Sequence, residues 1–104
     1  MVAAFNLGVW RQALLPHGAL YRWEGDQGRS GSGFVVLDSS AETVRPADPQ
    51  GQPVGGLTAD LRTSDVSGSS AGVDRASFTQ VVAAILRARA KSGEWPETAH
   101  AYFG

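Results

Sequence analysis

The sequence predicts an α+β fold in which a small antiparallel sheet of three or four strands is packed by an N-terminal and a C-terminal helix. Two observations carry this prediction. Apolar residues recur at helical spacing near both ends of the chain, in residues 1–15 and 74–92. Between them, residues 19–63 alternate short apolar runs with glycine- and proline-rich stretches, which is typical of a β-meander. Because the chain has 104 residues, we expect one domain over 1–104.

The N-terminal helix is expected over residues 1–15. It should end before Pro16, because proline disfavours helical geometry in the residue that precedes it. On a helical wheel the segment is apolar on two opposite faces. Such a helix is either buried between other elements or presents its second face, with Leu7, Trp10 and Leu14, to a binding partner.

The middle of the chain predicts a meander of short strands. Period-two alternation indicates a strand over residues 19–24, and a continuous apolar run over 34–37 indicates the central strand. Residues 42–45 form a weaker third strand and 57–63 a possible fourth, while 64–72 is expected to be a loop. The connections are too short for parallel crossovers, so the sheet should be antiparallel.

The C-terminal helix over residues 74–92 has the clearest local signals. Asp74 or Ser77 can cap its N-terminus, and Gly93 suits a left-handed residue just after its last turn. Its apolar residues follow the helical i, i+3, i+4 pattern and are expected to face the core: Phe78, Val81, Val82, Ile85 and Leu86.

Arg89 falls in the middle of this apolar arc. A buried, unpaired guanidinium is prohibitive, so Arg89 either extends past the edge of the core or pairs with a carboxylate of the acidic middle region or of a partner. The aromatic tail over 93–104 should pack against the domain. In it Pro96 is expected to start a short helical turn that places Trp95 and Tyr102 close to one face.

Composition excludes several classes of protein. Hydrophobic residues make up 42% of the chain, which argues against a disordered polymer. The net charge of −1 supplies no overall field toward nucleic acid or an anionic membrane. No apolar run is long enough to span a membrane, and the N-terminus lacks the basic region of a signal peptide. The absence of cysteine excludes disulfides and thiolate chemistry and fits a cytoplasmic location.

No catalytic, cofactor-binding or metal-binding motif is present. The only imidazoles are His17 and His100, and neither has further ligands at a metal-like spacing. The glycine-rich stretch over 25–33 lacks the order G-x-G-x-x-G and precedes a strand instead of a helix, so it predicts a hairpin connection and not a phosphate site.

By elimination, the sequence favours a non-enzymatic protein-binding module. Such a module could be a small bacterial-type inhibitor, immunity or accessory protein, or a homodimeric regulator. Its partner would then be another protein or a second copy of the chain. Aromatic residues and arginine are the usual anchors of interfaces. The candidate contact residues are Trp10, Leu7, Leu14, Arg89, Trp95 and Tyr102.

Two alternatives remain open. The chain could be a small ligand-binding protein or enzyme, with a cavity between sheet and helices and with His100 or Arg89 as its polar group. It could also be a nucleic-acid accessory protein that uses Arg87 and Lys91, although the four cations of residues 75–91 are weak support in a chain of net charge −1. The aromatic residues expected to line the ligand cavity are Tyr21, Trp23, Trp95 and Tyr102.

Overall fold

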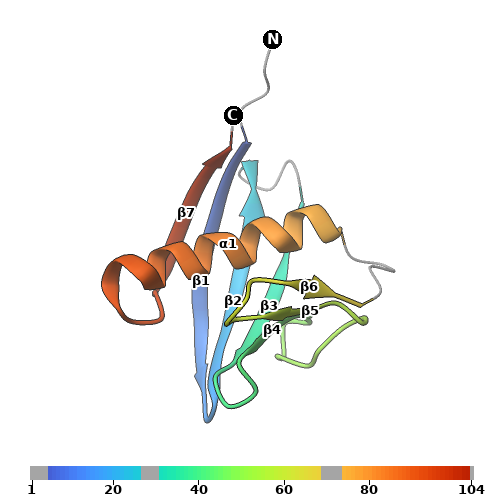
Figure 1. The fold of residues 1–104 in the computed structure, drawn as a ribbon. Helices are drawn as coiled ribbons and strands as arrows, with labels where there is room; N and C mark the ends of the chain where they lie inside the picture. Colours follow the sequence, from blue (N-terminus) through green and yellow to red (C-terminus); the bar gives the residue numbers. More distant parts are fainter. Residues whose placement is uncertain (1–4, 27–30, 69–73, 104) are drawn as a thin grey trace.

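One antiparallel sheet of seven strands and one helix account for the secondary structure of the residues that the computed structural model describes, which are 5–26, 31–68 and 74–103. The strands lie in the order β6-β5-β4-β3-β2-β1-β7, so the chain passes through a meander, crosses the sheet as α1 and returns beside β1 (Figure 1). The elements are β1 (Phe5–Leu15), β2 (Gly18–Gly25), β3 (Ser32–Asp38), β4 (Thr43–Ala47), β5 (Thr58–Asp60), β6 (Val66–Ser67), α1 (Arg75–Ser92) and β7 (Thr98–Phe103).

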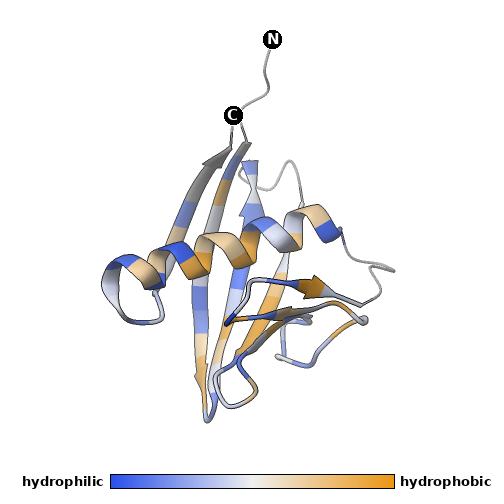
Figure 2. Ribbon diagram, in the orientation of Figure 1, coloured by the Kyte–Doolittle hydropathy of each residue, from blue (hydrophilic) through white to orange (hydrophobic). Residues whose placement is uncertain are grey.

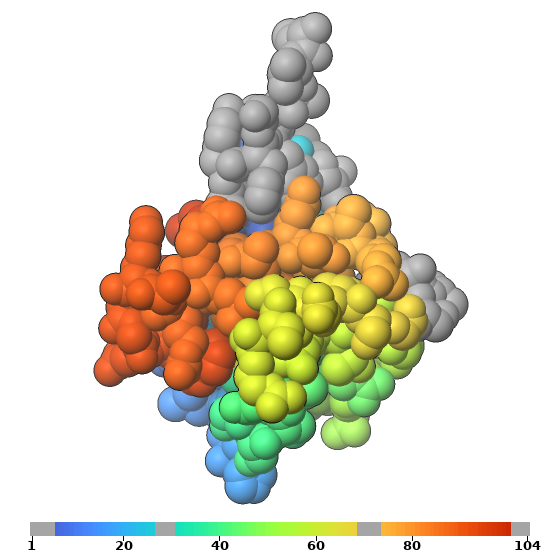
Figure 3. Space-filling view, in the orientation of Figure 1, coloured from blue at the N-terminus to red at the C-terminus, as the bar shows by residue number. Residues whose placement is uncertain are grey.

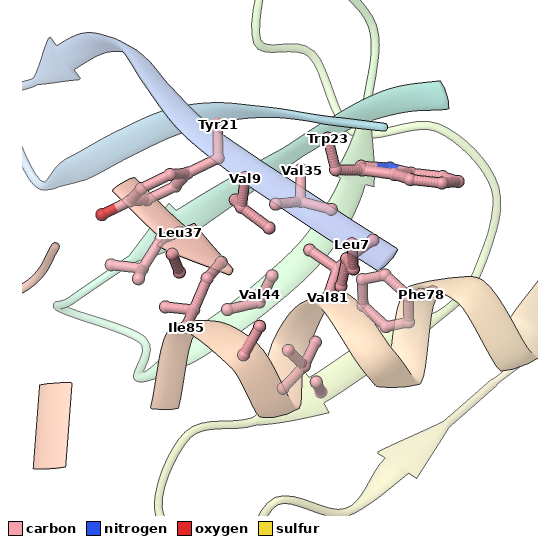
Figure 4. Close-up of a cluster of buried hydrophobic side chains, with 14 of the residues drawn as sticks. Leu7, Val9, Tyr21, Trp23, Val35, Leu37, Val44, Phe78, Val81 and Ile85 are labelled. Atoms are coloured by element: carbon pink, nitrogen blue, oxygen red, sulfur yellow. The ribbon is translucent and has the colours of Figure 1, made fainter. Parts of the chain in front are cut away.

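The core lies between the sheet and α1. Alternate residues of the strands point toward the helix, and strand pairing places Val9 opposite Trp23, and Tyr21 opposite Val35, on this face. Figure 4 shows these side chains meeting the apolar side of the helix. The helix contributes Phe78, Val81 and Ile85, each no more than 1% exposed. Figure 3 shows α1 next to the β5–β6 edge of the sheet.

The predicted N-terminal helix over residues 1–15 is wrong, because Phe5–Leu15 forms strand β1. Leu7 and Trp10, which a helical wheel places together, point to opposite faces of the sheet: Leu7 is 1% exposed in the core, and Trp10 lies on the other side. β1 pairs with β2 on one side and with β7 on the other, so long-range ladders satisfy its backbone. Gly8 in the middle of the segment also disfavours a helix.

The predicted sheet of three or four strands packed by two helices is therefore wrong as well. Its strands over 19–24, 34–37 and 42–45 correspond to β2, β3 and β4, and β5 occupies part of 57–63. The additional strands are β1, β6 and β7. The tail does not form a helical turn after Pro96, because Thr98–Phe103 joins the sheet beside β1.

Local signals define α1 at both ends. Asp74 is the N-cap, and its carboxylate accepts a hydrogen bond from the Ala76 N–H. Ser77 also donates to Asp74 at 2.6 Å, which lowers the pKa of that carboxyl. Gly93 has a left-handed φ of 77°, and its N–H donates to the Arg89 carbonyl, which ends the helix as predicted. Hydrophilic and hydrophobic residues are interspersed along α1 (Figure 2).

Candidate interaction surface

The sheet has a second face, which points away from α1 and which we name the outer face. Trp10, Arg22 and Phe34 alternate with core residues along β1, β2 and β3, so they lie on this face. Strand pairing places Trp10 directly opposite Arg22, and Arg22 directly opposite Phe34. The three residues, which we name the outer row, therefore lie side by side across three strands. Each is half-buried and keeps part of its side chain accessible.

Trp10 is held flat against the outer face by its neighbours. A Cβ added to Gly8 would lie 2.5 Å from Cη2 of Trp10, so the indole ring covers the glycine. The Arg22 guanidinium carbon is 5.6 Å from the centroid of the Trp10 ring, within the range of a cation–π contact. His100 of β7 meets the same ring edge-on at 6.1 Å between ring centroids. These contacts fix the position of the ring on the outer face.

Arg22 forms an ion pair with Glu24, its neighbour on the same face of β2. The Arg22 side chain is 39% exposed and that of Glu24 is 23% exposed. The pair neutralises the charge locally and fixes the guanidinium beside Trp10. Its remaining N–H groups stay within reach of an acceptor from solvent or from another molecule.

Aliphatic side chains extend the outer face toward the β3–β4 side. Leu20 of β2 lies opposite Val36 of β3, and Val36 lies opposite Arg45 of β4. One Nη atom of Arg45 donates to the Gly55 carbonyl at 3.1 Å, while its Nε is buried and has no hydrogen-bond partner. The outer face is therefore aromatic and aliphatic in character, with arginine as its main polar component.

The predicted contact residues are dispersed in the structure. Leu7 is buried in the core, and Trp10 lies in the outer row. Leu14 is 71% exposed near the end of β1, beyond an irregularity in the β1–β2 pairing between Arg11 and Ala13. The side chain of Tyr102 lies outside the described residues. Of the sequence candidates described, only Trp10 belongs to the outer row.

Arg89 and Trp95 contact each other. The guanidinium carbon of Arg89 lies 3.8 Å from the centroid of the Trp95 ring. The side chain thus leaves the core edge and stacks on an aromatic residue instead of pairing with a carboxylate among the described residues. We infer that this contact holds the connection between α1 and β7 in place.

The same connection is attached to the sheet by two polar contacts. The Tyr21 hydroxyl donates to the Pro96 carbonyl at 2.7 Å, and Arg11 lies 3.4 Å from a carboxylate oxygen of Glu97. Burial raises the pKa of the Tyr21 hydroxyl, and the nearby charge of Arg11 opposes that rise. These groups fix the path of the chain into β7 and so position His100 beside Trp10.

The aromatic residues of the predicted ligand cavity do not converge. Tyr21 is fully buried, whereas Trp23 and Trp95 line separate hollows. The hollow beside Trp23 measures about 330 Å³ and lies between the sheet and the start of α1, with Phe78 among its lining residues. This volume is near the lower limit of small-molecule sites, which is about 300 Å³.

The two histidines of the chain lie in different parts of the fold. His17 lies in the β1–β2 turn, where its carbonyl accepts a hydrogen bond from the Ser39 N–H, and it is remote from His100 on β7. No group of three or more histidine, cysteine, aspartate or glutamate side chains in the described residues could hold a metal ion. What the outer face offers is apolar contact area, ring stacking and guanidinium donors.

Sequence reasoning missed Arg22 and Phe34. The continuous apolar run over 34–37 predicts the central strand without distinguishing its two faces, and in β3 Val35 and Leu37 are buried while Phe34 and Val36 are only half-buried. Alternation places Arg22 on the face of β2 opposite Tyr21 and Trp23, and its cross-strand neighbours there are the aromatic residues Trp10 and Phe34. The sequence signal that indicates Arg22 is its alternation with Tyr21 and Trp23, and this signal places Arg22 beside Trp10 only when residues 5–15 are assigned to a strand.

Comparison with protein-family models, with curated proteins and with solved structures found no match. Within the described ranges, no helix has the length and apolar character that crossing a membrane requires.

Proposed function

We propose that this chain is a non-enzymatic protein-binding module, of the kind represented by small inhibitor, immunity or accessory proteins, and that it binds its partner with the outer face. The single observation that supports this most strongly is the outer row of Trp10, Arg22 and Phe34, aligned across three strands on the side of the sheet opposite α1. Tryptophan and arginine are the residue types most enriched among the energetically dominant contacts of interfaces.

The fixed position of Trp10 also favours recognition. Binding normally requires side chains to lose rotamer freedom, which costs about 0.5–1.5 kcal/mol for each flexible side chain that is immobilised. Contacts with Arg22 and His100 already restrict the Trp10 ring in the free protein. A partner that covers the ring therefore gains apolar burial without paying most of that ordering entropy.

The chemistry of the outer row also indicates what a partner would present. Flat aromatic rings suit apolar or aromatic side chains, and the half-exposed Arg22 suits a carbonyl or carboxylate acceptor near the middle of the contact. A stable interface of standard size buries about 800 Å² on each partner. The outer row would form the central part of such a contact, and the aliphatic residues toward Arg45 would surround it.

Substitution of Phe34 tests this proposal. Phe34→Glu places a charge in the apolar surface, and we expect it to weaken partner binding more than about tenfold, because an unpaired charge would be desolvated at the interface. The matched control is Thr79→Glu, which adds the same charge on the exposed side of α1. Affinity purification from the native host compares both variants with the wild-type chain, after thermal melting has confirmed that each is folded.

The expected result is that the wild type and Thr79→Glu retain the same partner while Phe34→Glu loses it. Retention of that partner by Phe34→Glu at the wild-type level would contradict a binding role for the outer face.

A second candidate function is supported by the hollow beside Trp23. Its aromatic walls and volume of about 330 Å³ are compatible with a small apolar ligand. Phe34 borders this hollow as well as the outer face, so Phe34→Glu can weaken ligand binding in the hollow as well as partner binding at the outer face. The matching variant for the outer row alone is therefore Trp10→Ala, which does not touch the hollow.

A further inference from the structure

Strand β7 forms one edge of the sheet in the part of the chain that the structure describes. It pairs with β1 on one side only, and its six residues contrast with the two residues of β6 at the opposite edge. Natural sheets usually protect an edge by shortness, by proline or by charged side chains. The segment Thr98–Phe103 contains neither proline nor any Asp, Glu, Lys or Arg, so it lacks these forms of protection.

The pairing register identifies which backbone groups this edge exposes. The Arg11 N–H donates to the Glu97 carbonyl at 2.8 Å, and the same register continues along β1 and β7. Hydrogen-bonded pairs alternate along an antiparallel ladder, so Ala99 and Ala101 bond to β1. The N–H and C=O groups of the alternate residues Thr98, His100 and Tyr102 therefore point away from the sheet, where an added strand would pair with them.

A basic groove lies beside this edge, between β7 and the C-terminal part of α1. It measures about 170 Å³, and its lining includes Arg87 and Lys91 of the helix together with Ala99 of the strand. Arg87 and Lys91 are one helical turn apart and exposed, and neither forms an ion pair with a described residue. A strand added to β7 would thus have one row of side chains next to two free cations.

We infer that the edge of β7 binds an extended segment of the partner in which acidic residues alternate with apolar ones. Successive side chains of a strand point to opposite faces. On the helix side, the added strand would meet Arg87 and Lys91. On the outer face, it would continue the aromatic surface of His100 and Trp10. This inference rests on the proposed protein-binding function and names the chemistry of its partner.

Charge favours such a partner over a second copy of the chain. If β7 paired with β7 of another copy, neither strand would place an acidic side chain near the basic groove of the other copy, because Thr98–Phe103 contains none. The Arg87 and Lys91 cations of both copies would also approach the same seam and repel one another. An acidic segment neutralises the groove, whereas a second copy doubles its charge.

Two synthetic peptides provide the probe. One is a blocked, fluorescently labelled peptide that alternates Glu and Val, and the other alternates Lys and Val. Fluorescence anisotropy at low salt measures their binding to the full chain. We expect the acidic peptide to bind more tightly than the basic peptide by about tenfold or more, and the difference to shrink as salt is added.

Variants of His100 test pairing at the edge. Because the His100 N–H points outward, His100→Pro removes a donor that β1 does not use, and proline is tolerated at such edge positions. His100→Ala removes the same imidazole and keeps the N–H. We expect the acidic peptide to lose about tenfold in affinity on His100→Pro relative to His100→Ala, with both variants folded by thermal melting.

Charge variants test the groove. Lys91→Glu should weaken binding of the acidic peptide about tenfold, whereas Arg62→Glu, at the opposite edge of the sheet, changes the net charge equally and should have little effect.

Equal binding of the two peptides, unchanged affinity for His100→Pro, or a dimer of the chain that His100→Pro dissociates would each overturn the inference. If the native partner is lost on Phe34→Glu but not on His100→Pro, the edge inference fails while the proposed function stands.

Discussion

Replacing Gly18 with alanine is expected to lower the free energy of unfolding by roughly 3 kcal/mol or more, as severe backbone clashes do. Gly18 begins β2 and lies opposite Asp38 of β3. A Cβ at this position would fall 1.7 Å from the Leu37 carbonyl oxygen and 2.7 Å from its carbon. Because the obstacle is backbone, β2 and β3 must separate locally, which breaks hydrogen bonds where the β2–β3 pairing begins.

Gly8→Ala is the matched control, since it makes the same change in the adjacent strand. There the added Cβ meets the far end of the Trp10 side chain, which can rotate away, so the loss of stability should be smaller than for Gly18→Ala. Urea denaturation followed by circular dichroism measures both. Equal stability of Gly18→Ala and the wild type would show that the β2–β3 register described above is wrong.

Phe78→Ala is the second change with a large expected effect. Phe78 is 1% exposed and lies where the first turns of α1 meet the sheet (Figure 4). Removing a fully buried phenyl ring leaves a cavity and costs about 3–5 kcal/mol of unfolding free energy. Thermal or denaturant unfolding of the purified variant measures this loss.

Phe34→Ala provides the comparison for Phe78→Ala. It deletes the same atoms from the outer face, where the ring is half-exposed, so we expect a stability loss well below that of Phe78→Ala. Partner binding should show the opposite order, with Phe34→Ala the more damaging of the two in the folded state. Equal destabilisation by both variants would mean that another element covers Phe34 and that the outer face is not free.

The C-terminal helix could be predicted because its signals are local. Asp74 caps it, Gly93 ends it, and the apolar residues between them follow helical spacing. Each of these features depends only on residues that are close together in the sequence. Ser77 illustrates the limit, since it was an alternative cap but lies inside the helix as a donor to Asp74.

Strands β1 and β7 could not be identified in this way, because partners far along the chain stabilise them. Trp10 lies opposite Thr98 in the β1–β7 pairing, and no local pattern reveals that contact. The alternation of Leu7 and Val9 with Gly8 and Trp10 fits a strand, but the same residues also fit a helical wheel with two apolar faces. Long-range pairing decided between the two patterns.

The candidate site was predicted only in part for the same reason. Trp10 was selected as the exposed face of a helix, and it is accessible as the exposed face of a strand. Arg22 and Phe34 became candidates only when the register placed them beside it. Arg89, a cation within the apolar arc of α1, lies over the ring of Trp95.

Site-specific photo-cross-linking in the native host tests the role of the outer face most directly. A photoreactive phenylalanine analogue is placed at Phe34 in one variant and at Thr79, on the exposed side of α1, in the other. The outer-face proposal predicts a covalent adduct with a partner protein from position 34 and none from position 79. An adduct from position 79 only, or the absence of any adduct from position 34, would contradict it.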